Sequence, residues 1–364
     1  MAIGQVGFFS GVAAAVLGSM RPMLAAWAQD LNSHGGLACH PVIVYSEDDG
    51  GDPARSAYLV QDMVTRHHVV AFIAPAMLTP TAFISAAEAA KVPVVGATGA
   101  EEYRHSSWVF PQSADNDDQI FGFVHNGVEH GKRRLGVLYC VEASACTDAA
   151  SKVKGIAKAA GAELVYSAPI SLTQTDYTAQ CLNARDAGVD QLALGMDGAS
   201  IGRVARSCEA VGYRPLFSTV AGLLSPAQAA DALIRSFGIV TATGEAPWIL
   251  DDTPGLRDYH RVLARWASNT APDGASIIAF TAAKLFEAAI VEVTAEATQG
   301  PITPQLIISG LDRIHDESLG GLTVGLTFHA GQKEHPSSGC VFYLNLTTTG
   351  WTTPDGSRPI CRPR

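Results

Sequence analysis

The stretch PVIVYSEDDGGDPARS, residues 41–56, contains a strand, a turn and the start of a helix. Its first six residues form an apolar run that predicts a strand, and its two glycines allow the chain to turn. Asp52 followed by proline predicts a helix with a carboxylate cap and proline at its first position. The acidic residues do not match a calcium loop, because position 12 counted from Asp48 is Leu59. We therefore expect a solvated, capped turn that supports neighbouring loops.

The same alternation of strand and helix continues on both sides of this stretch. Apolar runs at 3–9, 69–74 and 92–97 predict three further strands with helices between them. The pattern restarts after QSADNDDQ at 112–119, with RLGVLYCV, ELVYSAPI, DQLALGM and RPLFSTVA as the next strands. This order is typical of βαβ units, so we predict an α/β fold with two Rossmann-like lobes built on parallel sheets.

The last third of the chain changes character. LRDYHRVLARWA and the 25-residue stretch GASIIAFTAAKLFEAAIVEVTAEAT predict long helices, and LTVGLTF and CVFYLNLTTTGW predict strands after them. We interpret this as the chain returning to complete both lobes. The expected lobes are 1–118 with 250–328, and 119–249 with 329–364, joined by short crossovers.

Composition excludes several classes of function. The 364 residues carry a formal charge of −10 and only 16% charged residues, and the basic run GKRR is short and isolated. These values argue against nucleic-acid binding. No apolar segment reaches the roughly 20 residues of a membrane helix. GFFSGVAAAVLGSM at 7–20 lacks a preceding basic segment, so we interpret it as strand, loop and helix; if the protein is exported, its signal has been removed and Met1 is a substitute start.

The seven cysteines are placed as if for oxidation. Cys140 and Cys146 bracket one loop, Cys181 and Cys208 lie on successive predicted helices, and Cys340 and Cys361 flank the C-terminal hairpin. Three local disulfides and a free Cys39 would result, which implies an oxidising compartment. Scattered buried thiols are the alternative, since the sequence contains no C-x-x-C pair and no zinc-like spacing.

One enzymatic motif is present. GASIG at 198–202 matches G-x-S-x-G between a predicted strand and helix, which makes Ser200 a candidate nucleophile. Asp258 with His260 or His329 would have to complete a triad, and nothing selects them, while short Gly/Ser turns are common in α/β proteins. The GFFSG loop matches neither a dinucleotide nor a triphosphate motif. We expect no cofactor, no metal and no catalysis.

The order of these features resembles the type I periplasmic solute-binding proteins of branched-chain amino-acid ABC transporters, the leucine/isoleucine/valine-binding class. The resemblance is carried by IGQVGFFSG, LNSHGGLACHPVIVYSEDDGGDPARS, KVPVVGATGAEE, RLGVLYC and AVGYRPLFS, and covers nearly the whole chain. It implies two lobes joined by three crossovers, closing on a small solute that is presented to a membrane permease. The protein would then be periplasmic or extracellular, secreted or lipid-anchored.

The resemblance also implies binding residues in the first lobe. In the family, the solute's carboxylate meets a hydroxyl loop after the third strand, and backbone amides with a Thr after the fourth. The matching loops here are APAMLTPT and GATGAE. The candidates are Thr79, Thr98, Gly99 and Ala100, with Ser10 from the first loop. The alternative interpretation of each candidate is that it is an ordinary polar loop residue.

The second lobe departs from the family pattern. Ser144 stands where many relatives have an aromatic residue, and Val220 and Ala221 stand where amino-acid-binding relatives have an acid for the ammonium. A buried ammonium without a partner is costly, so an amino-acid solute would need Glu142 or Asp197 as a substitute. A carboxylate, amide or aromatic acid without the amine is the other solute class. A ligand-sensing regulator of the same fold and a hydrolase using Ser200 remain alternative functions.

Overall fold

A computed structural model describes residues 1–77, 79–142 and 144–362, and the chain divides into two compact units. Unit 1 comprises Met1–Asp115 and Leu250–Ser338, and unit 2 comprises Asn116–Ile249 and Gly339–Arg364. The chain therefore passes from one unit to the other three times. Both units have mixed helix and strand around parallel strands, as the sequence predicted.

Two of the three unit boundaries lie away from those expected. The chain changes unit after residues 115, 249 and 338, whereas the sequence suggested 118, 249 and 328. Residues 329–338 belong to unit 1 because both the backbone and the side chain of Arg104 form hydrogen bonds with them. The His335 amide donates to the Arg104 carbonyl at 2.9 Å, and Arg104 Nη1 donates to the His335 carbonyl at 3.1 Å.

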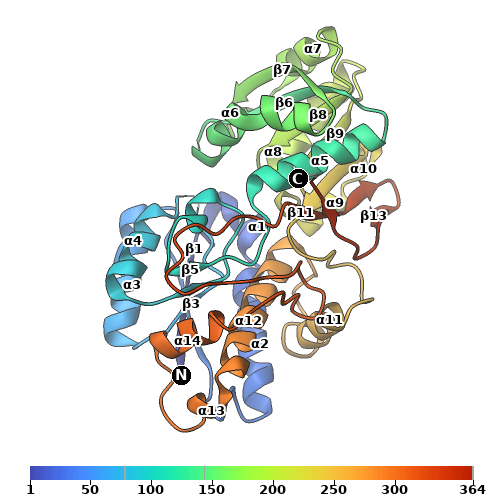
Figure 1. Cartoon of the computed structure of the whole chain (residues 1–364). Coiled ribbons are helices and arrows are strands. Elements are labelled where there is room, and N and C mark those ends of the chain that lie inside the picture. Colours follow the sequence, from blue (N-terminus) through green and yellow to red (C-terminus); the bar gives the residue numbers. More distant parts are fainter. Residues whose placement is uncertain (78, 143, 363–364) are drawn as a thin grey trace. The chain divides into compact units, whose positions relative to one another are not determined.

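Unit 1 is a three-layer sandwich. Its elements are β1 Ala2–Gly7, η1 Gly11–Ala13, α1 Ala14–Leu17, α2 Met20–Ser33, β2 Ile43–Asp48, α3 Pro53–Arg66, β3 Phe72–Ile73, α4 Thr81–Ala90, β4 Val94–Val95, η2 Glu101–Arg104, β5 Val109–Phe110, α11 Pro254–Trp266, α12 Gly274–Glu292, α13 Thr294–Ala297 and α14 Pro304–Leu311. The parallel sheet has the order β2-β1-β3-β4-β5. Helices α3 and α4 lie side by side on one face, and α2 and α12 on the other (Figure 1).

The quoted stretch at 41–56 forms the expected structure within unit 1. Asp52 Oδ1 accepts hydrogen bonds from the amides of Ala54 and Arg55 at 2.8 and 3.4 Å. This cap begins α3, with proline in the first turn. The two aspartates at the end of β2 accept amide hydrogen bonds from the glycine pair. The acidic turn therefore caps and turns the backbone, as predicted, but it is not wholly solvated: Asp49 is 2% exposed and also accepts the Ser56 hydroxyl.

Unit 2 repeats the plan of unit 1. Its elements are α5 Asn116–Glu129, β6 Arg134–Cys140, α6 Ser144–Ala159, β7 Glu163–Ile170, α7 Thr178–Asp186, β8 Gln191–Gly195, α8 Gly198–Ala210, β9 Leu216–Val220, η3 Ala221–Leu223, α9 Pro226–Ala230, α10 Ala232–Phe237, β10 Ile239–Thr243, β11 Cys340–Tyr343, β12 Asn345–Thr347, β13 Gly350–Thr352 and β14 Ile360–Cys361. The sheet order is β13-β12-β10-β9-β8-β6-β7, and β11 pairs with β10 and β14. Strands β6 to β10 are parallel, and the C-terminal strands add antiparallel to β10.

The three disulfides predicted from the sequence are confirmed, and all lie in unit 2. Cys140 bonds to Cys146, Cys181 to Cys208, and Cys340 to Cys361. Cys39 in unit 1 is free and exposed.

Two details of the last third differ from expectation. The 25-residue helical stretch breaks at Val293, whose φ of −121° and ψ of 26° end α12 before the short α13 begins. Residues 322–328 form only an isolated bridge, between Leu326 and Glu317, instead of a strand. By length and composition α12 passes as a candidate membrane span, but 72% of its most apolar window is buried, as in a core helix.

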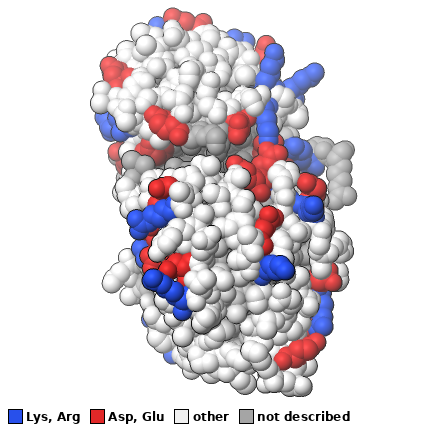
Figure 2. Space-filling model, turned by 90° about the vertical axis from the view of Figure 1, so that its left-hand side faces the viewer, with Lys and Arg blue, Asp and Glu red and all other residues white. Residues whose placement is uncertain are grey.

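Charged side chains are sparse on the surface. Figure 2 shows a face on which acidic and basic residues are interspersed among larger uncharged areas, consistent with 16% charged residues. Both signs are mixed on this face, which is unlike the single-sign surface of a nucleic-acid-binding protein.

Candidate functional site

Unit 1 has a topological switch point between β1 and β3. The chain leaves β1 for β2 on one side and then crosses to β3 on the other, so the loops after β1 and β3 diverge at the carboxyl edge of the sheet. The Phe8 amide donates to the Ala76 carbonyl at 2.8 Å, and the Ala76 amide donates to the Val6 carbonyl at 3.2 Å. These bonds join the two loops at the edge where open α/β sheets bind their ligands.

The loop after β1 presents Ser10 with an exposed side chain. Asp48 Oδ1, at the end of β2, anchors this loop by accepting the amide hydrogen bonds of Phe9 at 3.0 Å and Gly50 at 2.9 Å. Partial burial acts to raise the pKa of Asp48, but hydrogen bonds from Ser10, Gly50 and Phe9 outweigh it and lower the pKa. The Ser10 hydroxyl is therefore held beside a charged carboxylate.

The loops after β3 and β4 carry the other unit 1 candidates. Thr79 is exposed, Thr98 and Ala100 are half-buried, and Gly99 is buried. Because β1, β3 and β4 are neighbours in one parallel sheet, these loops share one edge with Ser10.

The loop after β4 is held in place by Gln112 and packs closely against α12. Gln112, which follows β5, accepts a hydrogen bond from the Ala97 amide at 2.8 Å through Oε1. Gly96 has a φ of +71°, and a Cβ there would lie 2.2 Å from the Cβ of Ala282 on α12. Only glycine fits this close approach. The sequence reasoning missed Gln112, although its position just after a short strand is a usable signal.

Unit 2 has the equivalent switch point between β6 and β8. Glu142 follows β6 and is exposed, but it is bound locally: Oε1 accepts hydrogen bonds from Ser171 Oγ at 2.5 Å and the Leu172 amide at 2.8 Å. Desolvation would raise the pKa of Glu142, yet these hydrogen bonds prevail and lower it. The carboxylate is thus charged and already attached to the loop after β7, a partnership that the sequence did not reveal.

Asp197, which follows β8, caps α8. Its Oδ1 accepts the amides of Ala199 and Ser200 at 2.9 and 3.1 Å, and its Oδ2 accepts the Ser200 hydroxyl at 2.5 Å. Both oxygens therefore have partners within the first turn of the helix. The proposed ammonium ligand has a structural role in its own unit.

Ser200 is fully buried in the first turn of α8. Besides donating to Asp197, its hydroxyl accepts a hydrogen bond from Arg203 Nη2 at 2.7 Å. A nucleophile elbow exposes its serine at the end of a strand. The GASIG motif is instead a helix cap, and the interpretation of Ser200 as an elbow nucleophile does not fit this geometry.

The remaining unit 2 candidates differ in accessibility. Val220 ends β9 and is half-buried, whereas Ala221 begins η3 with no exposed surface. The Ala221 methyl is thus packed in the protein interior. Ser144 begins α6, but its side chain lies outside the described part of the structure.

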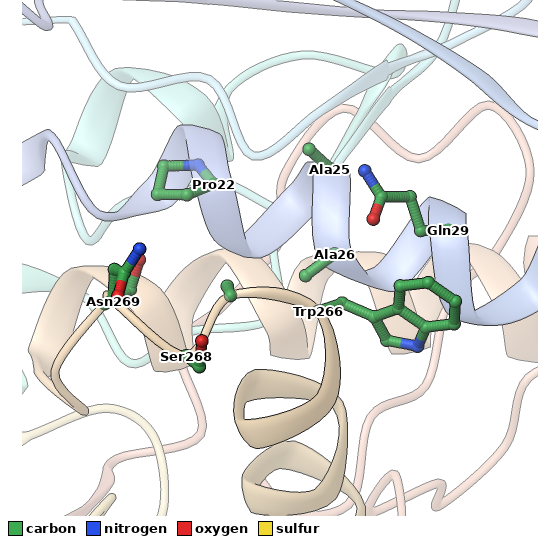
Figure 3. Close-up of a pocket in the computed structure, with 9 residues that line it drawn as sticks. Pro22, Ala25, Ala26, Gln29, Trp266, Ser268 and Asn269 are labelled. Carbon is green, nitrogen blue, oxygen red and sulfur yellow. The ribbon is translucent and has the colours of Figure 1, made fainter.

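A surface pocket of about 350 Å³ lies elsewhere in unit 1. Helix α2 supplies Pro22 and Gln29, and the end of α11 with the following segment supplies Trp266 and Asn269 (Figure 3). None of these residues follows the carboxyl end of a strand. Within residues 1–77, 79–142 and 144–362, no group of three His, Cys, Asp or Glu is arranged to hold a metal ion.

Two α/β units with the same strand order, connected by three passages of the chain, define the class of type I periplasmic binding folds. The chain belongs to the periplasmic binding protein family, whose model matches residues 1–344. Membership of this family implies an extracytoplasmic location, with which three disulfides agree.

Solved structures share the fold at low sequence identity. A possible leucine/isoleucine/valine-binding protein from Rhodopirellula baltica SH 1 is 18% identical, with a TM-score of 0.81 over 97% of this chain and 95% of that one. A fatty acid ABC transporter substrate-binding protein from Thermomonospora curvata is 17% identical, with a TM-score of 0.78 over 97% and 91%. A solute-binding protein from R. palustris, in complex with 4-hydroxybenzoate, is 17% identical, with a TM-score of 0.75 over 100% and 98%. A comparison with curated proteins found no match.

Proposed function

We propose that this protein is the solute-binding component of an ABC importer, and that its solute is a small organic acid or amide without an α-amine. Binding occurs between the lobes by hinge closure, without a catalytic step, and delivers the solute to a membrane permease. Thr79, Thr98 and the amides of Gly99 and Ala100 receive the carboxylate or amide on the unit 1 side, and Ser10, whose hydroxyl donates to Asp48, borders them on the same edge of the sheet.

The main support for this proposal is that the acidic side chains of unit 2 are hydrogen-bonded to their own loops and helix. Glu142 holds the loop after β7, and both oxygens of Asp197 cap α8. At the position where amino-acid-binding relatives are expected to have an acid, Ala221 is buried. An ammonium would have to pair with the lone pairs that these local contacts leave, and an ammonium left unpaired in a closed site costs several kcal/mol. A carboxylate needs only donors, which hydroxyls and backbone amides supply.

One structural relative is named as a fatty acid ABC transporter substrate-binding protein, and another is in complex with 4-hydroxybenzoate. The fold therefore accommodates acids without an amine.

A thermal-shift screen tests the solute class. The panel pairs 4-hydroxybenzoate, benzoate and octanoate with leucine and valine, and includes benzyl alcohol as the uncharged control. A solute at 100 times its Kd adds about 2.7 kcal/mol, which raises Tm by several degrees. We expect a shift from at least one of the amine-free acids and none from leucine, valine or benzyl alcohol. A shift from leucine without a shift from any acid would contradict the proposed solute class.

Variants then test the site. Thr98→Val and Thr79→Val should each weaken binding of the acid identified in the screen by roughly tenfold, because each removes a hydroxyl that donates a hydrogen bond to a charged group. Thr65→Val is the matched control, since Thr65 is an exposed threonine of α3 whose hydroxyl bonds to its own helix. Calorimetric Kd values equal to the wild type in the two site variants would exclude these residues from the site.

A further inference from the structure

The C-terminal segment, residues 345–362, lies beyond the part of the chain that the family model matches. Strand β12 pairs antiparallel with β10, β13 pairs with β12, and β14 pairs with β11. The Cys340–Cys361 disulfide fastens the end of the segment to β11. The segment thus makes its contacts at the side of unit 2 where the chain enters and leaves.

At the first passage between units, Arg362 binds the beginning of α5. Arg362 Nη2 lies 2.8 Å from Asp118 Oδ1 and donates to the Asp117 carbonyl at 3.1 Å. Its guanidinium also lies 4.9 Å from the centroid of the Phe121 ring. The Asp118 side chain is only 7% exposed, so removing Arg362 would take an ion-pair partner from a largely buried carboxylate.

At the third passage, the Asp118 carboxylate and the Arg362 backbone amide hold the incoming strand. The Gly339 amide donates to Asp118 Oδ2 at 3.0 Å, and the Arg362 amide donates to the Gly339 carbonyl at 2.7 Å. Gly339 is the first residue of unit 2 after this passage. One carboxylate therefore joins the first and third passages inside unit 2.

At the second passage, the contact is aromatic. Trp248, one residue before the last residue of that part of unit 2, is 2% exposed. The Trp351 ring of β13 lies 5.6 Å from it at an interplanar angle of 77°. Edge-to-face pairs of this kind add to the stabilisation from burial.

We propose that the C-terminal segment is a brace that holds the three chain passages together in unit 2 and limits how freely the two units move about them. This inference rests on the hinge closure of the proposed function. Hinges are a few residues that absorb backbone rotation, so bonds at residues 117–118, 248 and 339 restrict the range of that rotation. A looser brace widens the set of open conformations.

Distances between the units test the brace in the full chain without any solute. The exposed thiol of Cys39 provides a spin-label site in unit 1, and Lys158→Cys provides one on the exposed end of α6 in unit 2. Pulsed electron resonance then measures the width of the distance distribution. We compare Arg362→Gln, Trp351→Leu and the double variant Cys340→Ser/Cys361→Ser with the otherwise unchanged protein. Arg358→Gln is the matched control, because Arg358 pairs only with Asp355 among the contacts described.

We expect a broader distance distribution in the three brace variants and the original width in the control. Hydrogen exchange at residues 339–341 should accelerate on the order of tenfold in Arg362→Gln, while exchange in α8 stays unchanged and shows that unit 2 is folded. An unchanged width in all three variants, with folded unit 2, would overturn the brace. Since no solute is present, that result would leave the proposed function untouched, and a failed solute screen would leave the brace standing.

Discussion

Units 1 and 2 share one strand order and are reinforced by different means. The order β2-β1-β3-β4-β5 in unit 1 corresponds to β7-β6-β8-β9-β10 in unit 2. All three disulfides lie in unit 2, whereas the single cysteine of unit 1 is free. The same topology is therefore compatible with covalent and with noncovalent reinforcement.

Unit 1 relies on a buried helix and an ion pair. Helix α12 crosses the core and buries 13 of its 19 residues. Asp30 on α2 accepts two hydrogen bonds from Arg261 on α11, both at 2.7 Å, and one from Trp266 Nε1 at 3.0 Å. These contacts join helices that are far apart in sequence, whereas the disulfides of unit 2 join segments separated by 6, 27 and 21 residues.

Reduction of the disulfides should therefore produce the largest difference in stability between the two units. The Cys181–Cys208 bond closes a separation of 27 residues, and its loss should lower the free energy of unfolding of unit 2 by about 3.5 kcal/mol. Unit 1 should keep its stability in reductant. Hydrogen exchange in denaturant, followed by peptide for each unit, measures this difference. Equal loss of protection in both units would show that they unfold as one body, and Cys39→Ser with reductant is the control.

Removing the carboxylate of Asp30 should have the next largest effect, in unit 1 alone. Asp30→Ala leaves the Trp266 indole without its acceptor and removes a bidentate partner of Arg261, so we expect a loss of about 2 kcal/mol. Asp258→Ala is the comparison, because it removes a more exposed acid from the same arginine. Urea unfolding that gives both variants the same stability would show that burial does not strengthen the Asp30 pair.

Acid should weaken the same contact. Hydrogen bonding to Arg261 lowers the pKa of Asp30 from 3.8 to about 2, with Trp266 adding to the effect. A lowered folded-state pKa gives stability that is complete above the unfolded value and is lost as pH falls from about 4 to 2. After allowance for solvent screening, we expect about 1–2 kcal/mol. Asp30→Asn should flatten this part of the stability curve of unit 1.

The two aspartate caps offer a smaller contrast. Asp52 caps α3 in unit 1 through backbone amides alone, while Asp197 in unit 2 also accepts the buried Ser200 hydroxyl. We expect about 1 kcal/mol for Asp52→Ala and nearer 2 kcal/mol for Asp197→Ala. Chemical denaturation of both variants provides the test. If Asp197→Ala instead left stability unchanged and abolished solute binding, Asp197 would belong to the site and not to the helix cap.

Changing the free cysteine should have the smallest effect. Cys39 is exposed, so Cys39→Ser should alter the free energy of unfolding by less than about 0.5 kcal/mol. Thiol titration should find one reactive thiol in the native protein and all seven only after denaturation with reductant. More than one thiol without reductant would contradict the disulfide pairing in unit 2.

Local patterns explain why much of this fold is predictable. The helix start at Asp52 depends on atoms within three residues of it, and the alternation of apolar runs with helical periods specifies the βα units. The cysteine pairs were predictable because each pair joins elements that the chain places next to each other. The boundary after 338 was not, because it depends on the contact between Arg104 and His335, which are far apart in sequence.

The candidate site shows the same limit. The sequence placed hydroxyls and acids on loops after strands, and the structure locates these loops at the carboxyl edges of two sheets. It could not show that Asp197 accepts hydrogen bonds from its own helix, or that Ser171 donates a hydrogen bond to the carboxylate of Glu142. Whether a side chain is available to a ligand depends on which partners the fold brings to it.

By itself, the sequence determined the class of fold, the repeated strand–helix units, the Asp52 helix cap and the disulfide-bonded cysteines. Propensity, periodicity and short-range hydrogen bonds act within a few residues, so they can be recognised in the sequence. Only the tertiary structure decided that Ser200 is buried, that Glu142 and Asp197 are engaged, and that Arg362 reaches Asp118. These outcomes depend on burial and on contacts between distant segments, and the free energy of such contacts exists only once the chain has packed.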